Sequence, residues 1–505
     1  MTGRRARLEE LIGEITDDRR SEAVRLLQQL VATPSYSGHE GQAGEPGSAV
    51  GKLRSELARH DTTVDVDPVT DAGDNLVEVV KGEDGSTLVL EAHTDTVPEG
   101  DPRLWMECGP FAGATGSVEY LGNATVRVSV GAERVDRVIR DKMARIWERR
   151  SSRRRSIVYG RGSFDNKGAV VSLALATDAL STALERTGCR LAGTLVAAFT
   201  VDEEVASRGV RRLACGEDSW LATHGYLRGP RDDRGFLTGI QGVALDGSYG
   251  WVPVVGHRGA LQMAVTTHGR AAHASTPMLG VNAVEGMSRV LLALTDGADE
   301  LCALLNRQLN DSLVGPATIA VGTTIVGGGV ESVSRPGGAP RVIRGGVNSI
   351  PDWCESTLDV RFPPGPRYPE DVQAVYSTVL QTVRGFLSSR IDAGAWTWGV
   401  EPIEESANPP VAMAATVEDA AAIPLVVHLG NRSAQVLGYE VPLEIAPGGT
   451  DATFMVHEAG IPTLVELGPA GALSHDAHEY VEIDDVVAGA KILALLAVDV
   501  LGTVE

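Results

Sequence analysis

The stretch LVLEAHTDTVP, residues 88–98, indicates the fold class of the chain. Its apolar start is typical of a strand buried on both faces, and TLVAAFT at residues 194–200 has the same character. Between them, NKGAVVSLALATDALSTAL (residues 166–184) predicts a helix. Buried strands that alternate with helices predict a parallel or mixed sheet with helices on both faces, which is the architecture of an α/β domain.

The composition narrows the class of protein further. The chain has 505 residues, of which 43% are hydrophobic and 22% charged, so we expect a globular protein with two or more domains. The net charge of −22 argues against a nucleic-acid partner, and no apolar run reaches the roughly 20 residues of a membrane span. The five cysteines include no CxxC pair, which argues against a thiolate zinc site. Residues 1–20 lack the apolar stretch of a signal peptide, so we expect a cytoplasmic protein.

The order of predicted strands and helices changes near residue 252, which predicts a second domain. The order β-α-β-β-α-β follows, which is typical of a ferredoxin-like α+β sandwich, and α/β texture returns near residue 405. We therefore expect an α/β domain of residues 1–254 and 405–505, with residues 255–404 inserted in it. Within the added segments, residues 132–155 predict a helix, and their run of arginines is expected to form a solvated face or loop. The added segments are residues 113–156, 213–240 and 327–346.

Histidine and carboxylate residues follow the apolar strands, at the positions where strands end. Because the carboxyl ends of neighbouring strands in an open α/β sheet meet at one edge, these side chains are candidates for a single site. Each also has a simpler interpretation, as a strand cap or a solvated acidic turn. The candidates are His93, Asp95, Asp165, Glu203, Glu204 and Asp246.

The spacing of these residues favours a metal site. The alternation of an extended chain points His93 and Asp95 to the same side, as for a ligand and the carboxylate that orients it. The adjacent carboxylates Glu203 and Glu204 repel each other unless a cation or proton offsets their charge, so one can bind metal while the other acts as a general base. The glycine-rich turn at Asp165 lacks the spacing of a phosphate-binding loop, and its backbone N–H groups can hold the carboxylate.

Two histidines near residue 475 are alternatives for one further ligand. In SHDAHEY (residues 474–480), His475 and His478 are three residues apart, and spacing alone does not choose between them. His257 and His273, in the inserted segment, are interpreted on spacing alone as ordinary surface or core residues. Imidazole and carboxylate groups are typical zinc ligands, and the whole set is large enough for two metal ions with one carboxylate free.

Motifs along most of the chain resemble those of the co-catalytic dizinc metallopeptidase and deacylase family. That family includes aminoacylase, succinyl-diaminopimelate desuccinylase, acetylornithine deacetylase, carboxypeptidase G and carnosine-type dipeptidase. The resemblance implies a three-layer α/β catalytic domain with an inserted ferredoxin-like lid domain, through which two subunits pair as a homodimer. In chain order the motifs are HTD, GRGSFDNKG, DEE, an aspartate, GRAAHAS, NSIPD, LDVRFPP, GGTDA and SHDAHEY.

The resemblance also implies roles for particular residues. Two zinc ions, with cobalt or manganese as alternatives, would be bound, and the HxxxE spacing of the family selects His475 over His478. Glu203 would be the general base, Asp95 would orient His93, and His273 would stabilise the oxyanion in a neighbouring subunit. The implied metal ligands are His93, Asp165 (shared by both ions), Glu204, Asp246 and His475. The implied contacts to a substrate carboxylate are Asn348, Arg361, Gly448, Gly449 and Thr450.

The implied reaction is hydrolysis of the amide bond of a small N-acyl amino acid or dipeptide, by a hydroxide that bridges the metals. Two alternatives keep the same fold: a member that forms an amide bond in a specialised pathway, and a non-catalytic binding relative. Asp246 stands where the dipeptidases have aspartate, whereas GGTDA is closer to the deacylases. The resemblance therefore leaves the acyl group, the amino acid and the native metal open.

Overall fold

The computed structural model describes residues 3–504 apart from short gaps, and the described chain forms two compact units. The first unit comprises Met1–Gly256, Met413–Ala446 and Thr450–Glu505, and the second comprises His257–Ala412 and Pro447–Gly449. The expected domain boundary at residues 404–405 lies outside the described residues. The role of the second unit as a lid stays a prediction. The gaps are residues 61, 72, 84, 310–312, 328–329, 334–340, 345–347, 366–370, 393 and 404–406.

The centre of the first unit is a mixed β-sheet. Its strands include β1 (Thr63–Thr70), β2 (Gly73–Val80), β3 (Thr87–His93), β9 (Thr194–Thr200), β10 (Ile240–Leu245), β11 (Val254–His257) and β22 (Thr463–Leu467). They run in the order β1-β2-β9-β3-β10-β22-β11, and β9, β3, β10 and β22 are parallel. All seven residues of β3 are buried, as expected for a strand covered on both faces. The predicted α/β fold class is therefore confirmed.

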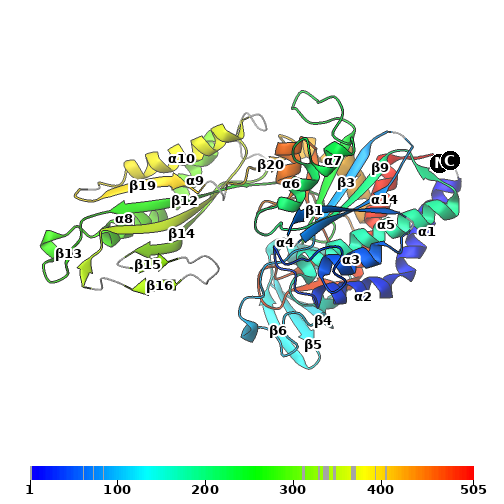
Figure 1. Ribbon diagram of the computed structural model, residues 1–505, viewed down its shortest axis with the longest axis horizontal. Coiled ribbons are helices and arrows are strands. Elements are labelled where there is room, and N and C mark those ends of the chain that lie inside the picture. The colour runs from blue at the N-terminus through cyan, green and yellow to red at the C-terminus, as the bar shows by residue number, and fades with distance from the viewer. Residues whose placement is uncertain are drawn as a thin grey trace. The chain divides into compact units, whose positions relative to one another are not determined.

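Helices cover both faces of this sheet (Figure 1). The main ones are α1 (Gly3–Asp18), α2 (Arg20–Val31), α3 (Ala49–Leu57), α5 (Gly168–Thr187), α6 (Arg208–Ala214), α7 (Trp220–Thr223), α12 (Pro424–Leu437) and α14 (Ile483–Leu501). Helices α5 and α14 pack against each other and contact β3 and β9. Helices α6 and α7 bury Leu213 and Trp220 against Val89 and Val196. Burial on both faces explains why the central strands are apolar throughout.

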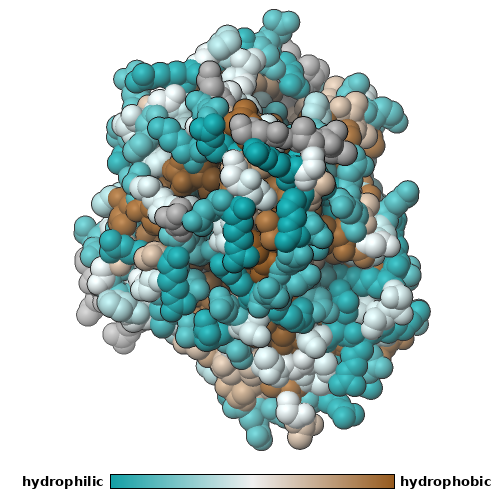
Figure 2. All heavy atoms as spheres, turned by 90° about the vertical axis from the view of Figure 1, so that its right-hand side faces the viewer, coloured by the Kyte–Doolittle hydropathy of each residue, from teal (hydrophilic) through white to brown (hydrophobic). Residues whose placement is uncertain are grey.

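The face of the protein that carries the chain ends is largely polar (Figure 2). Figure 2 shows the side of the molecule that carries the chain ends, where hydrophilic side chains predominate and apolar atoms form small separate patches. Among the described residues, the segment Ser163–Thr187 is long and apolar enough to cross a membrane, but 83% of its apolar window is buried inside the protein. Such burial is typical of the core helix of a globular domain.

The expected addition at residues 113–156 builds a second sheet in the first unit. It contains β4 (Ala114–Gly122), β5 (Thr125–Val130), β6 (Glu133–Val138), α4 (Asp141–Arg149) and β7 (Arg154–Tyr159). The sheet order is β23-β24-β7-β4-β5-β6, so it also recruits β23 (Gly471–Ala472) and β24 (Tyr480–Glu482). The helix expected over residues 132–155 forms only at its centre, as α4, so the prediction is wrong at both ends. The first end is strand β6, whose side chains alternate between half-buried and exposed and which pairs antiparallel with β5. The other end is part of β7, which pairs with β4.

The arginine run in this segment is partly buried, which corrects the expectation of a solvated face. The guanidinium of Arg150 lies 2.8 Å from the Glu482 carboxylate and 3.1 Å from that of Asp485, with only 4% of its side chain exposed. Arg155 contacts the same two carboxylates at 3.2 Å. Glu482 ends β24 and Asp485 lies in α14, so these ion pairs fix the arginine run to β24 and to helix α14.

The second unit has the predicted ferredoxin-like order. Its elements are β12 (Gly259–His268), α8 (Ala283–Asp296), α9 (Ala298–Gln308), β14 (Thr318–Gly327), β18 (Trp353–Phe362), α10 (Val372–Ser388) and β19 (Thr397–Pro402). The antiparallel strands run in the order β14-β18-β12-β19, and α8 and α10 lie along this sheet (Figure 1). The addition expected at residues 327–346 forms a small ribbon, β15 (Val330–Val333) with β16 (Arg341–Arg344), and its other residues lie mostly outside those described.

Candidate metal centre

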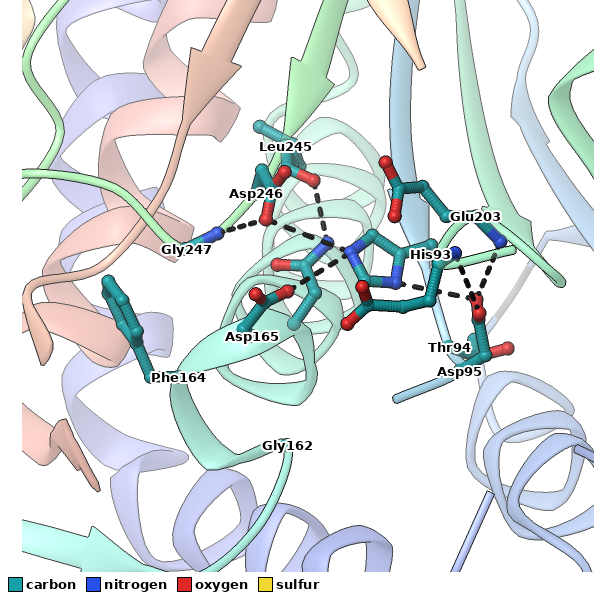
Figure 3. Close-up of polar contacts among 12 residues, drawn as sticks. His93, Thr94, Asp95, Gly162, Phe164, Asp165, Glu203, Leu245, Asp246 and Gly247 are labelled. Atoms are coloured by element: carbon teal, nitrogen blue, oxygen red, sulfur yellow. Dashed lines mark hydrogen bonds and ion pairs between the residues drawn. The ribbon is translucent and has the colours of Figure 1, made fainter. Parts of the chain in front are cut away.

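The ends of three parallel strands bring the candidate residues together. Strand β3 lies between β9 and β10, so its last residue, His93, lies beside the residues that follow its two neighbours. Asp246 follows β10, and Glu203 and Glu204 follow β9 after a short turn. Figure 3 shows Asp165, Asp246, Asp95 and Glu203 grouped around His93.

Two sets of ligand atoms share Asp165. In the first set, Nε2 of His93 lies 3.3 Å from Oδ1 of Asp165 and 3.7 Å from Oδ1 of Asp246. In the second, Nε2 of His475 lies 3.4 Å from Oδ2 of Asp165 and 3.1 Å from Oε2 of Glu204. Within each set the ligand atoms all lie within 4.8 Å of one another. The two oxygens of Asp165 therefore face different histidines, as a carboxylate shared by two ions would.

The surroundings of these atoms fit a pair of divalent cations. Both ring nitrogens of buried His93 face carboxylate oxygens, at 3.3–3.7 Å, but none of these contacts has the geometry of a hydrogen bond. Burial and the nearby charge of Asp165 raise the pKa of Glu204 to about 7. Hydrogen bonds to Asp165 and Glu204 raise the pKa of His475 to about 10. Crowded carboxylates that favour a proton in this way are stabilised equally by metal cations, and imidazole with carboxylate is a common donor set for zinc.

Asp95 connects His93 to the acidic turn after β9. Its Oδ1 lies 3.4 Å from Nδ1 of His93 and accepts the backbone N–H of Glu203 at 3.0 Å. Its Oδ2 accepts the N–H of Glu204 at 3.1 Å and the hydroxyl of Ser37 at 2.6 Å. One buried carboxylate thus orients the histidine ring and also holds the backbone that carries both glutamates.

Glu203 stands beside the two ligand sets but belongs to neither. Burial raises the pKa of its carboxyl well above the ordinary value, and the charges of Asp451 and Asp246 add to the shift against the opposing effect of His93. A carboxylate that is close to the ligands, not itself a ligand and inclined to take a proton has the properties of a general base.

The turn that carries Asp165 is held by a residue that the sequence analysis did not single out. Buried Glu479 accepts the N–H groups of Gly162, Phe164 and Asp165 at 2.9–3.0 Å, and the Arg161 guanidinium lies 2.5 Å from its Oε2. Glu479 is the glutamate of the HxxxE motif that begins at His475, and this motif was the sequence signal that could have identified it. Two further buried acids near the centre, Glu91 and Asp451, were also not assigned.

The structure separates the two histidines that spacing left as alternatives. His475 lies in the second ligand set, with 55% of its side chain exposed. His478 is buried, and its Nδ1 lies 3.1 Å from the hydroxyl of Tyr159, next to the ring of Trp105. His478 therefore packs in the core of the added sheet, away from the ligand atoms.

The expected substrate contacts are divided between the two units. Thr450 belongs to the first unit and donates its hydroxyl to the carbonyl of Val465. Gly448 and Gly449 belong to the second unit, as do the other two expected substrate contacts. The Asn348 carbonyl accepts the N–H of Ala274, and Arg361 pairs with Asp359 at 2.8 Å. His273, the expected oxyanion residue, is also in the second unit, where its strand partner is Ser349.

The fold and the ligand geometry define an α/β protein with a candidate dinuclear metal centre. The chain belongs to peptidase family M20/M25/M40, whose sequence pattern matches residues 136–499. This match confirms the family resemblance. It begins after His93 and Asp95, so those two residues are placed at the centre by their geometry alone.

Relatives and solved structures agree with this membership. Succinyl-diaminopimelate desuccinylase of Methylorubrum extorquens (strain PA1) is 28% identical over 275 residues, which are 54% of this chain and 56% of the relative. The chain spans about half the length of the curated relatives it matches. Aminopeptidase PepT of Bacillus cereus ATCC 10987 has a TM-score of 0.54 at 17% identity, covering 95% of this chain and 98% of that one. The YXEP protein of Bacillus subtilis, described as a dinuclear metal-binding peptidase of family M20, has a TM-score of 0.54 at 16% identity, covering 97% and 100%.

Proposed function

We propose that the protein is a metal-dependent hydrolase that cleaves the amide bond of a small N-acyl amino acid or dipeptide. The observation that carries this proposal is the sharing of Asp165 by two ligand sets, with Glu203 free beside them. The family supports hydrolysis as the reaction class, and a related sequence is named a desuccinylase. Zinc is the proposed metal, with cobalt or manganese as alternatives.

The residues of the first unit can supply the proton transfers of such a reaction. Divalent ions at a dinuclear site lower the pKa of water and polarise an amide carbonyl. Glu203 takes the proton from the attacking water and delivers it to the leaving amine nitrogen. Burial raises the pKa of its carboxyl well above the ordinary value, which makes it a stronger proton acceptor than an exposed glutamate. Asp95 keeps His93 and the Glu203 backbone in place throughout.

Residues of the second unit are proposed to recognise the substrate. Arg361 has the planar fork that binds a carboxylate, and Asn348, Gly448 and Gly449 offer further polar groups, together with Thr450 of the first unit. His273 is exposed, and we propose that it stabilises the oxyanion in a second copy of the chain, which requires a homodimer paired through this unit. His273→Ala is then expected to lower turnover without loss of metal.

Hydrolysis of a panel of N-acyl amino acids and dipeptides, with and without a chelator, tests the proposed function. Glu203→Ala is expected to lower kcat by about 10²–10⁴-fold with metal content unchanged. Glu217→Ala, at an exposed glutamate of the same unit, is the matched control and should leave kcat unaltered. Normal turnover by Glu203→Ala would overturn the assigned role.

A further inference from the structure

The turn that carries Glu203 and Glu204 begins where strand β9 leaves the main sheet. The pairing of β9 with β2 ends at Phe199, and its pairing with β3 ends at Thr200. Backbone N–H groups beyond the end of a strand need other acceptors, because a buried N–H without a partner is costly. In this turn the N–H groups of residues 201–204 all donate to side-chain oxygens. The position of the turn therefore depends on the side chains that accept them.

Three side chains from other segments accept these N–H groups. Oδ1 of Asn75 accepts the N–H of Val201 at 3.3 Å. Oε1 of Glu40 accepts the N–H of Asp202 at 3.0 Å. Asp95 accepts the remaining two, which belong to the candidate base and the candidate ligand that follows it. Glu40 thus holds the residue that immediately precedes the candidate base.

The loop that carries Glu40 is itself fixed to the rest of the centre. The Glu40 side chain is fully buried. Ser37 of the same loop donates its hydroxyl to Asp95 at 2.6 Å. Where the loop begins, the buried ammonium of Lys167 donates to the carbonyl of Thr33 at 3.0 Å. Because this lysine follows the shared ligand by two residues, the loop is connected to the turns on both sides of the centre.

Asp202 has a backbone conformation that needs such support. Its φ of +67° lies in the left-handed region, which residues other than glycine adopt infrequently and retain only where their surroundings fix them. The Arg208 guanidinium holds the Asp202 carboxylate at 2.6 Å, and Glu40 holds the Asp202 N–H. Without the contact to Glu40, the chain would relax toward a more common conformation, and Glu203 would move with it.

We propose that Glu40 is a positioning residue, which holds the N–H of Asp202 and thereby keeps the Glu203 carboxylate in place for proton transfer. The inference rests on the proposed hydrolase function and adds a residue to it. Glu40 belongs to neither ligand set. Because Asp95 also holds the turn, loss of the Glu40 contact should displace the base without releasing a metal ion. A small displacement of a group that transfers protons lowers turnover steeply.

Two conservative variants separate the contact that Glu40 makes from its charge. Glu40→Gln keeps an oxygen acceptor of the same reach, and burial already raises the pKa of the Glu40 carboxyl to about 7, so an uncharged side chain suits this position. Glu40→Asp keeps the carboxylate but is one methylene shorter. With the substrate that the wild-type protein hydrolyses best, Glu40→Asp should lower kcat by about 10–100-fold, and Glu40→Gln by less than about threefold.

The Michaelis constant and the metal content should change little in either variant, since neither substrate contacts nor ligands are altered. Glu45→Ala is the matched control, because Glu45 also accepts a backbone N–H, that of Gln42 at 3.2 Å, but is exposed. It should leave kcat unaltered. Equal kcat in Glu40→Asp and Glu40→Gln, or a larger loss in Glu40→Gln, would overturn the positioning role.

Amide hydrogen exchange separates failure of this inference from failure of the proposed function, because it needs no turnover. In the metal-loaded protein, a peptide spanning residues 200–207 should exchange about tenfold faster in Glu40→Asp than in the wild-type protein, Glu40→Gln or Glu45→Ala. If no amide is hydrolysed but exchange follows this pattern, Glu40 holds the turn and the hydrolase proposal fails. If amides are hydrolysed but this peptide exchanges equally in Glu40→Asp and the wild-type protein, the role of Glu40 is refuted.

Discussion

Oδ1 of Asp95 lies 3.4 Å from Nδ1 of His93, and the same carboxylate accepts the N–H groups of Glu203 and Glu204. The loop after β3 and the turn after β9 are therefore fixed to each other by one buried side chain. Movement of Asp95 would displace a candidate ligand from each metal set together with the candidate base.

Asp95→Asn is expected to weaken metal binding by about 10–100-fold without unfolding the protein. The amide keeps the size of the carboxylate, but its NH₂ group faces donors where an acceptor is needed. Competition with a metal chelator measures the affinity. Asp101→Asn is the control, because Asp101 is half-buried and is not a candidate ligand, and its carboxylate pairs with Arg103. Equal affinity in both variants would refute the orienting role of Asp95.

Glu479→Gln is expected to lower the free energy of unfolding by about 3–5 kcal/mol, because it leaves the buried Arg161 without its counter-charge. It should also weaken metal binding, since Glu479 holds the N–H of Asp165. Urea unfolding and chelator competition measure the two effects. Glu458→Gln removes the carboxylate of a more exposed ion pair with Arg211 and should cost less than about 1 kcal/mol. Similar losses in the two variants would contradict this account of the Asp165 turn.

Stability of the metal-free protein should depend on the charge of Glu466. Burial, with the nearby charge of Asp246, raises the pKa of this carboxyl from 4.5 to about 8, against the opposing charges of Arg140 and Lys142. Between these pH values the folded state holds a proton that the unfolded chain lacks. The free energy of unfolding therefore falls as pH rises through this window, by up to about 1.4 kcal/mol per pH unit.

Denaturant unfolding of the metal-free protein between pH 5 and 8 measures this dependence. Glu466→Gln should flatten the profile, because the amide does not titrate. Glu440→Gln, at an exposed glutamate, should leave the slope unchanged. A slope that is the same in the wild-type protein and in Glu466→Gln would show that other groups are responsible.

Local sequence was sufficient to find the candidate ligands that follow strands. His93 and Asp246 directly end or follow β3 and β10, whose apolar runs are continuous in the sequence, and their neighbouring parallel arrangement brings them together. The choice of His475 over His478 came from the family motif. Spacing could not make that choice, because burial of His478 against Tyr159 depends on a strand more than 300 residues away.

Contacts between distant segments explain what the sequence did not predict. Residues 132–155 contain enough helix-forming residues to suggest one helix, but pairing of β6 with β5 and of β7 with β4 and β24 takes both ends into a sheet. Glu479 was overlooked because its function is to hold the backbone of Asp165, a contact that no local pattern reveals.

Metal content after reconstitution with zinc tests the central claim, two ligand sets that share Asp165, most directly. The wild-type protein should hold two ions per chain, His475→Ala should hold one, and His478→Ala, which removes a histidine outside both sets, should hold two. No bound metal in the wild-type protein, or loss of an ion from His478→Ala but not from His475→Ala, would contradict the assignment.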